Sequence, residues 1–283
     1  PFSVVCATLA APETGPGADP SPALWQHGGR GAATPLTPEV PHPAPQTRPA
    51  MDAAAENRRC EGCHTAIATE WRGSLHRSSA EDPLFVAAHE LEPRQFCVDC
   101  HDPEGDATLG VGCVTCHMPT GDILGPRDLP KTDAHHAVRA SAAVRESLAC
   151  AGCHEFVFPG QKALLQRTHT EHARSAFADQ RCQDCHMPVV TGPDGKRHRS
   201  HDFHVLGNRA LISSAVSASA VRRGDRSLAV TLVPGRTGHA FPTGDLFRRV
   251  ELRAFTDDAR ARVEAGAVAL ERVFATKPGI GRV

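Results

Sequence analysis

The chain carries the pentapeptide Cys60-Glu61-Gly62-Cys63-His64, and the same pattern of Cys, two residues, Cys and His returns four more times. The later copies are Cys97–His101, Cys113–His117, Cys150–His154 and Cys182–His186. Together they use ten of the 11 cysteines in 283 residues. A pattern that recurs five times within one stretch of chain is expected to decide both the fold and the chemistry.

Three kinds of site use a Cys-x-x-Cys pair. Structural zinc sites do, but tetrahedral zinc does not require a histidine directly after each pair. Thioredoxin-like redox sites use one such motif beside a βαβ pattern, not five in series. Covalent attachment of c-type haem needs both cysteines and the adjoining histidine at every site, because the thiols bind the haem edge and the imidazole binds the iron.

We therefore predict five covalently attached haems c. The predicted attachment residues are Cys60, Cys63, Cys97, Cys100, Cys113, Cys116, Cys150, Cys153, Cys182 and Cys185. The predicted proximal iron ligands are His64, His101, His117, His154 and His186.

The sixth iron ligands are expected to be imidazoles. The chain has 17 histidines but three methionines; Met118 and Met187 directly follow proximal histidines, and Met51 stands at the edge of a linker. The preferred distal ligands are His76, His136, His172, His201 and His239. His135, His169 and His204 are the alternatives beside three of these, His89 is the reserve, and His198 is expected to be a solvated surface residue.

The composition predicts three segments. Residues 1–50 are expected to hold a signal-peptide remnant and a linker rich in Pro, Ala and Gly, which cannot build a core. Residues 51–223 are expected to form a mainly α domain with extensive loops, packed around the five haems. Residues 224–283 are expected to form a small β-rich module that is truncated or completed by a partner.

Hydrophobic periodicity gives a coarse view of the local structure. Helices are expected near 134–147, 160–179 and 208–221. Alternating apolar and polar residues predict strands at 227–233, 249–255 and 268–274.

Several blocks resemble multihaem c-type cytochromes related to hydroxylamine oxidoreductase. These are the segment Trp71–His76, the block Gly110–His117, the block Cys182–Pro188 with His201-Asp202-Phe203 after it, and the Gly-His-x-Phe-Pro-Thr-Gly loop at His239. Two departures separate the chain from enzymatic relatives. The sequence has no Tyr to cross-link an active haem, and no Cys-x-x-Cys-Lys motif of the kind found in ammonia-forming nitrite reductases.

These observations favour an electron-transfer protein that relays electrons through closely packed haems. The alternative is a periplasmic multihaem oxidoreductase acting on a small nitrogen or sulfur compound. The expected partners are redox proteins, namely a membrane electron donor and a terminal reductase or extracellular acceptor, and an oligomer or filament is a further option. Haem ligation of this kind takes place outside the cytoplasm, so a periplasmic or extracellular location is expected. A net charge of −1 argues against nucleic-acid binding, and no apolar run is long enough to span a membrane.

Overall fold

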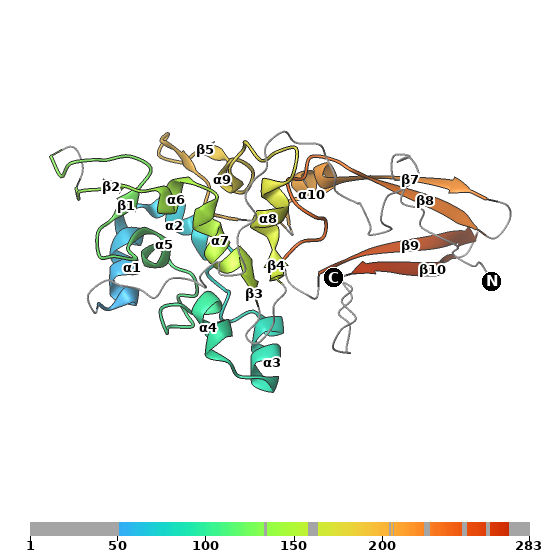
Figure 1. The fold of residues 1–283 in the computed structure, drawn as a ribbon, viewed down its shortest axis with the longest axis horizontal. Helices are drawn as coiled ribbons and strands as arrows, with labels where there is room; N and C mark the ends of the chain where they lie inside the picture. Colours follow the sequence, from blue (N-terminus) through green and yellow to red (C-terminus); the bar gives the residue numbers. More distant parts are fainter. Residues whose placement is uncertain are drawn as a thin grey trace, which may run out of the picture. The chain divides into compact units, whose positions relative to one another are not determined.

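The computed structural model describes residues 51–132, 135–157, 164–203, 205, 207–223, 227–244, 248–258 and 261–271 (Figure 1). The predicted leader and linker over 1–50 lies outside these residues, as do His204 and residues 272–283. In the described part of the chain, no helix combines the length and the apolar character needed to cross a bilayer.

The helices are short. They are α1 (Ala53–Cys63), α2 (Thr65–Arg72), α3 (Pro83–Leu91), α4 (Gln95–His101), α5 (Cys113–His117), α6 (Ala142–Arg145), α7 (Leu148–His154), α8 (Thr168–Ala173), α9 (Cys182–His186) and α10 (Arg209–Ala215). Side-chain caps define where two of them begin. Asp52 accepts a bond from the Ala55 amide at 2.8 Å before α1, and Asp82 caps α3, whose first residue is Pro83.

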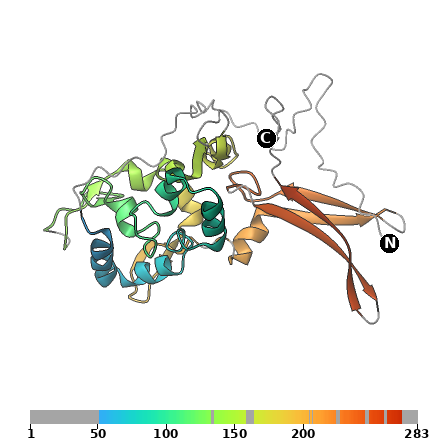
Figure 2. The same cartoon turned by 90° about the horizontal axis from the view of Figure 1, so that it is seen from below.

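Within the described residues, the strands form two-stranded sheets. They are β1 (Leu124–Gly125), β2 (Arg139–Ala140), β3 (Glu155–Val157), β4 (Leu164–Arg167), β5 (Val189–Thr191), β6 (Arg197–Arg199), β7 (Val216–Arg222), β8 (Leu228–Pro234), β9 (Arg249–Asp258) and β10 (Ala261–Glu271). β1 and β2 are parallel, β3 pairs with β4, and the β5/β6, β7/β8 and β9/β10 pairs are antiparallel. Figure 2 shows the last two pairs as long ribbons.

The chain divides into two compact units. The motif unit comprises the described residues up to Leu165 together with Asp179–Asn208, and it contains all five Cys-x-x-Cys-His motifs. The strand unit comprises Gln166–Ala178 and the described residues from Arg209 onward. The expected domain limit at 223/224 falls between β7 and β8, which pair with each other. Helix α8 and its histidines therefore group with the β-rich C-terminal segment.

Protein side chains supply little core in the motif unit. Trp71, Leu109 and Val114 form its buried cluster, with the Trp71 indole donating to the Val111 carbonyl at 2.9 Å. Helix α3 is apolar, yet it buries none of its residues, and Leu91 is 89% exposed. A folded unit with so few buried side chains leaves room for apolar material other than protein.

The segment after α2 is hydrogen-bonded to the residues just before the third motif, next to a glycine. The Val111 amide donates to the His76 carbonyl at 2.9 Å, and Gly110 beside it has a φ of +54°. A Cβ atom at Gly110 would lie 2.5 Å from the carbonyl oxygens of both His76 and Arg77. Glycine is required here for its conformation and for its lack of a side chain.

Three predicted helices are wrong in extent or type. The segment near 160–179 contains β4 and α8, and 158–163 lies outside the described residues. The segment near 134–147 contains β2 and the short α6. The segment 208–221 forms α10 only to Ala215 and then β7, because its alternating small residues pair with β8 along seven positions. The strands at 227–233 and 249–255 are confirmed as β8 and β9, and 268–271 lies in β10.

Asn57 connects the first motif to the third. Its side chain is fully buried; Oδ1 accepts from the Cys113 amide at 2.7 Å, and Nδ2 donates to Glu61 Oε1 at 2.7 Å. We predict that Asn57→Ala lowers the free energy of unfolding by about 1–3 kcal/mol, since it leaves a buried amide without an acceptor. Guanidinium denaturation of the mature protein measures this. Arg59→Ala, which removes an exposed ion pair with Glu56, is the control; equal stabilities of the two variants would contradict the prediction.

Candidate haem attachment sites

Each motif occupies one turn of helix. The motifs lie at the end of α1 and within α4, α5, α7 and α9, and His64 follows α1 directly. On a helix, positions i, i+3 and i+4 share one side. The two thiols and the imidazole of each motif therefore project toward one flank of their turn. This is the arrangement that attachment of a planar group through two sulfurs and a metal-bound nitrogen requires.

Two proximal imidazoles are oriented by backbone carbonyls. Nδ1 of His117 donates to the Leu124 carbonyl at 2.8 Å, and Nδ1 of His101 donates to the Ser79 carbonyl at 3.0 Å. A proton held on Nδ1 leaves the Nε2 lone pair available to a metal, and such a bond fixes the ring orientation. Phe85 stacks on the His101 ring with centroids 4.0 Å apart.

Three predicted distal histidines each face a proximal one. The ring centroids are 6.1 Å apart for His64 and His136, 6.3 Å for His154 and His76, and 6.3 Å for His117 and His201. Two imidazoles bound to opposite faces of one metal ion, with nitrogens about 2 Å from it, hold their ring centres about 6.3 Å apart. The residues present therefore fit an iron between the rings of each pair.

Burial keeps several of these imidazoles neutral. Burial, with the neighbouring imidazoles of His154 and His201, lowers the pKa of His76 to about 4. Burial also lowers the pKa of His64 and of His201. The neutral ring is the form that binds metal.

The other two preferred distal ligands lie in the strand unit. His172 is on α8, and a Cβ atom at Gly238 would lie 3.0 Å from its Cδ2. His239 follows Gly238, and its Nδ1 donates to the Ala240 carbonyl at 2.9 Å. The structure thus brings His172 and His239 close to one loop. Their service as ligands remains a prediction.

The alternative histidines differ in their surroundings. Nδ1 of His169 is buried, with no hydrogen-bond partner in the described part of the chain. His89 stacks on Phe85, with centroids 5.4 Å apart. His198 is not the solvated residue expected from its basic neighbours, because its Nε2 contacts Glu70 Oε1 at 3.0 Å and its side chain is 13% exposed.

Thiols of different motifs lie close together. Burial and the nearby Cys60 thiol raise the pKa of Cys113 to about 12. The Cys150 and Cys182 thiols share a hydrogen bond, which raises the pKa of Cys150, and the same holds for Cys153 beside Cys100. The attachment points of neighbouring motifs are therefore adjacent.

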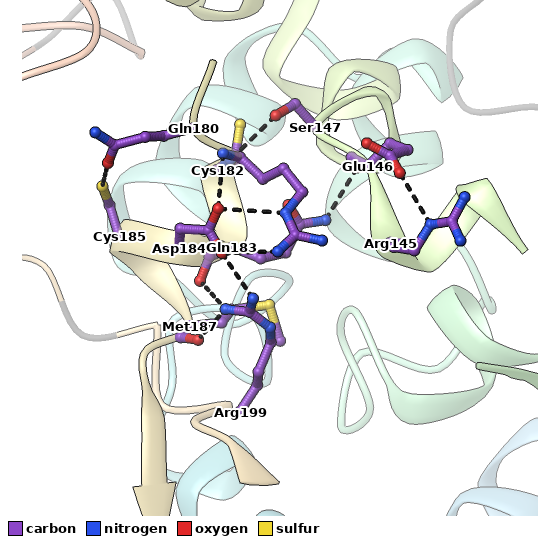
Figure 3. Close-up of polar contacts among 11 residues, drawn as sticks. Arg145, Glu146, Ser147, Gln180, Cys182, Gln183, Asp184, Cys185, Met187 and Arg199 are labelled. Carbon is purple, nitrogen blue, oxygen red and sulfur yellow. Dashed lines mark hydrogen bonds and ion pairs between the residues drawn. The ribbon is translucent and has the colours of Figure 1, made fainter. Parts of the chain in front are cut away.

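A polar network holds α9 in place (Figure 3). The Cys182 amide donates to Ser147 Oγ at 3.1 Å, and Gln183 Nε2 donates to the Glu146 carbonyl at 3.0 Å. Arg199 donates to the Gln183 and Met187 carbonyls at 2.8 and 3.0 Å and to the Asp184 carboxylate at 2.7 Å. The last motif is thereby fixed between the start of α7 and strand β6.

The sequence analysis missed Asn57, Ser147, Glu70 and Glu171 as supporting residues. Asn57 and Ser147 each stand three residues before the first cysteine of a motif, and this shared position was a readable signal. The two glutamates bind loops that are distant in sequence, and no local pattern indicates which loop each one binds.

The fold resembles that of a multihaem c-type cytochrome. The structural neighbour that shows this is a penta-heme cytochrome c552 from Thermochromatium tepidum, with a TM-score of 0.60 and 21% sequence identity over 79% of this chain and 74% of that chain. No protein family and no curated protein matches the sequence. The relation to hydroxylamine oxidoreductase stays a prediction.

The network around α9 predicts a pH-dependent contribution to stability. Hydrogen bonds from Arg181 and Arg199 hold the pKa of Asp184 well below its usual range. A carboxyl whose pKa is depressed by folding contributes fully above its unfolded value of about 3.9, and the contribution is lost as the pH falls through the folded value. We predict that Asp184→Asn costs about 1–2 kcal/mol at pH 7 and progressively less below about pH 4.

Urea denaturation at a series of pH values measures the difference. Asp122→Asn removes an exposed ion pair with Arg139 and serves as the control with little effect. A destabilisation by Asp184→Asn that does not change with pH would refute the electrostatic explanation.

Proposed function

We propose that this protein is an electron-transfer cytochrome that carries five covalently attached haems c, each ligated by two histidines. The observation that carries the proposal is the set of three imidazole pairs at 6.1–6.3 Å, each joining a motif histidine to a histidine from another part of the motif unit. The recurring motif supplies the attachment chemistry, and the fold shared with a penta-heme cytochrome is consistent with it.

Haem supplies an iron that gains and loses one electron. The protein's residues fix that iron in place. The ten cysteines would anchor the haems covalently, and the motif histidines and the distal histidines would ligate their irons. Two strong imidazole ligands change little with oxidation state, and backbone carbonyls hold the rings of His117 and His201 in orientation. This chemistry suits a relay.

Adjacency of the motifs supports a continuous path. The Cys60 thiol lies near Cys113, Cys116 near Cys153, Cys150 near Cys182, and Cys153 near Cys100. These proximities connect all five motifs of one compact unit, with the fourth motif next to the second, the third and the fifth. Haems attached at neighbouring sulfurs lie close to each other, which is what electron transfer between them needs.

The proposal extends to ligands, location and partners. We propose His172 and His239 as the two remaining distal ligands, because the other three preferred distal histidines each lie beside a motif histidine. Attachment of haem c outside the cytoplasm places the protein in the periplasm or beyond the cell. Its partners are then redox proteins that donate and accept single electrons.

We predict five haems per chain. The intact mass of the mature protein should exceed that of the polypeptide by five haem masses. Cys63→Ser should lower the count towards four, whereas the exposed substitution Arg59→Ala should leave it at five. A product that binds only zinc or forms only disulfides would end the proposal.

We predict that His76→Ala, His136→Ala and His201→Ala each open one iron. The reduced variants should bind one carbon monoxide per chain and show one high-spin haem in the oxidised form, whereas the unsubstituted protein should bind none. His89→Ala is the control and should remain low-spin. Stoichiometric binding of carbon monoxide by the unsubstituted protein would instead favour the enzyme.

A further inference from the structure

The motifs fall into two pairs with matching sequences. The first and fourth motifs both have glycine before the second cysteine, at Gly62 and Gly152. The third and fifth are both followed by Met-Pro, at Met118-Pro119 and Met187-Pro188. The order of a Gly-type motif and then a Met-Pro-type motif therefore occurs twice along the chain.

The same hydrogen bonds connect each pair. Asn57 and Ser147 each stand three positions before a Gly-type motif. Each accepts a hydrogen bond from the backbone amide of the first cysteine in the Met-Pro-type motif. The residue before the second cysteine of that motif, Thr115 or Asp184, accepts the amide at the start of its own helix. We call the stretch of sequence from Asn57 to His117 the first module, and the stretch from Ser147 to His186 the second.

One helix that lies between the two motifs of each pair also matches, namely α2 for the first pair and α8 for the second. Helix α2 contains Thr69-Glu70 and α8 contains Thr170-Glu171, and a serine follows each glutamate four residues later. The next backbone bonds coincide: Ser74 donates to the Trp71 carbonyl at 2.9 Å, and Ser175 donates to the His172 carbonyl at 3.0 Å. Glu70 and Glu171 therefore occupy equivalent positions in the two modules.

Each glutamate holds a loop that carries a predicted distal histidine. Glu70 Oε2 accepts the His201 amide at 2.8 Å, and Glu171 Oε2 accepts the Ala240 amide at 3.1 Å. The other oxygen of each carboxylate binds a basic side chain, with His198 on Glu70 at 3.0 Å and Arg167 on Glu171 at 3.2 Å. In both loops the histidine Nδ1 donates to a nearby carbonyl, Arg199 for His201 and Ala240 for His239.

We infer that Glu70 and Glu171 are equivalent positioning residues, which hold the loops of His201 and His239 so that each imidazole is presented to iron. The inference rests on the proposed function, since it requires both histidines to be ligands. The backbone of Ala240 links the two groups. Its amide binds Glu171 while its carbonyl orients His239, so the carboxylate sets the direction of the imidazole.

A carboxylate suits this task. Glu171 is 14% exposed and also accepts from Thr243 Oγ1 at 2.7 Å, so it fixes both sides of the short segment after His239. Hydrogen bonds to a charged acceptor are stronger than those between neutral groups. Thr168 contacts Thr243 at 2.9 Å and holds the same segment to α8.

The test uses the mature full-length protein, with carbon monoxide as the probe. Glu171→Ala should raise the carbon monoxide bound per reduced chain from none towards one, and His239→Ala should raise it to one. The double variant should bind no more than His239→Ala alone, because both changes act on one ligand. Added imidazole should restore the low-spin spectrum, and Glu171→Gln, which keeps an acceptor oxygen, should remain largely low-spin.

Parallel variants test the equivalence. Glu70→Ala and His201→Ala should behave as their counterparts do, and Glu251→Ala on β9 is the control with no effect. If Glu171→Ala fails to fold, Thr243→Val removes one hydrogen bond of the same segment. It should raise the carbon monoxide bound per reduced chain by less than Glu171→Ala would. The inference is overturned if the Glu70→Ala and Glu171→Ala variants stay low-spin, or if the Glu171→Ala/His239→Ala double variant binds two carbon monoxide molecules per chain. If the protein carries five haems and His239→Ala binds no carbon monoxide, the inference fails but the proposed electron-transfer function stands. If the protein carries no haem, the proposed function itself fails.

Discussion

One helical turn has to direct two thiols and an imidazole to the same side. The rest of the structure depends on this constraint. It explains why the motif helices are as short as five residues in α5 and α9, since nothing beyond the turn is needed. It also explains why side chains such as Asn57, Ser147 and Arg199 act on helix ends rather than on helix faces. In a unit whose buried apolar cluster is Trp71, Leu109 and Val114, the proposed cofactors would complete the core.

Short-range chemistry was the part that could be predicted from the sequence. The spacing within each pentapeptide depends only on its own turn, so the attachment residues could be predicted without tertiary information, and the structure places every motif on a helical turn. The number of histidines also led to His76, His136 and His201. Their pairing could not be predicted: His76 follows the first motif closely, yet its ring faces His154 of the fourth. Such pairing depends on how loops return, which no local pattern encodes.

The sequence predictions that were wrong also failed because contacts between distant segments decide the structure. Residues 216–221 were predicted to be helical, but an alternating run of small residues becomes a strand when β8 lies beside it. His198 was assigned to solvent because its neighbours are basic, yet Glu70 reaches it from a helix 128 residues earlier. Strands β8 and β9 were predicted correctly because their alternation spans the element. The role of His172 and His239 stays a prediction.

Gly110 has a consequence for comparing sequences across species. Any side chain there would collide with the backbone of His76, so a related protein with another residue at this position must move the segment that carries this histidine. The presence or absence of this one glycine should therefore divide related sequences into those that keep this backbone geometry and those that have diverged from it. A single position in an alignment would then serve as an evolutionary marker for the placement of the His76 ring beside His154, whose motif begins 40 residues after the glycine, at Cys150.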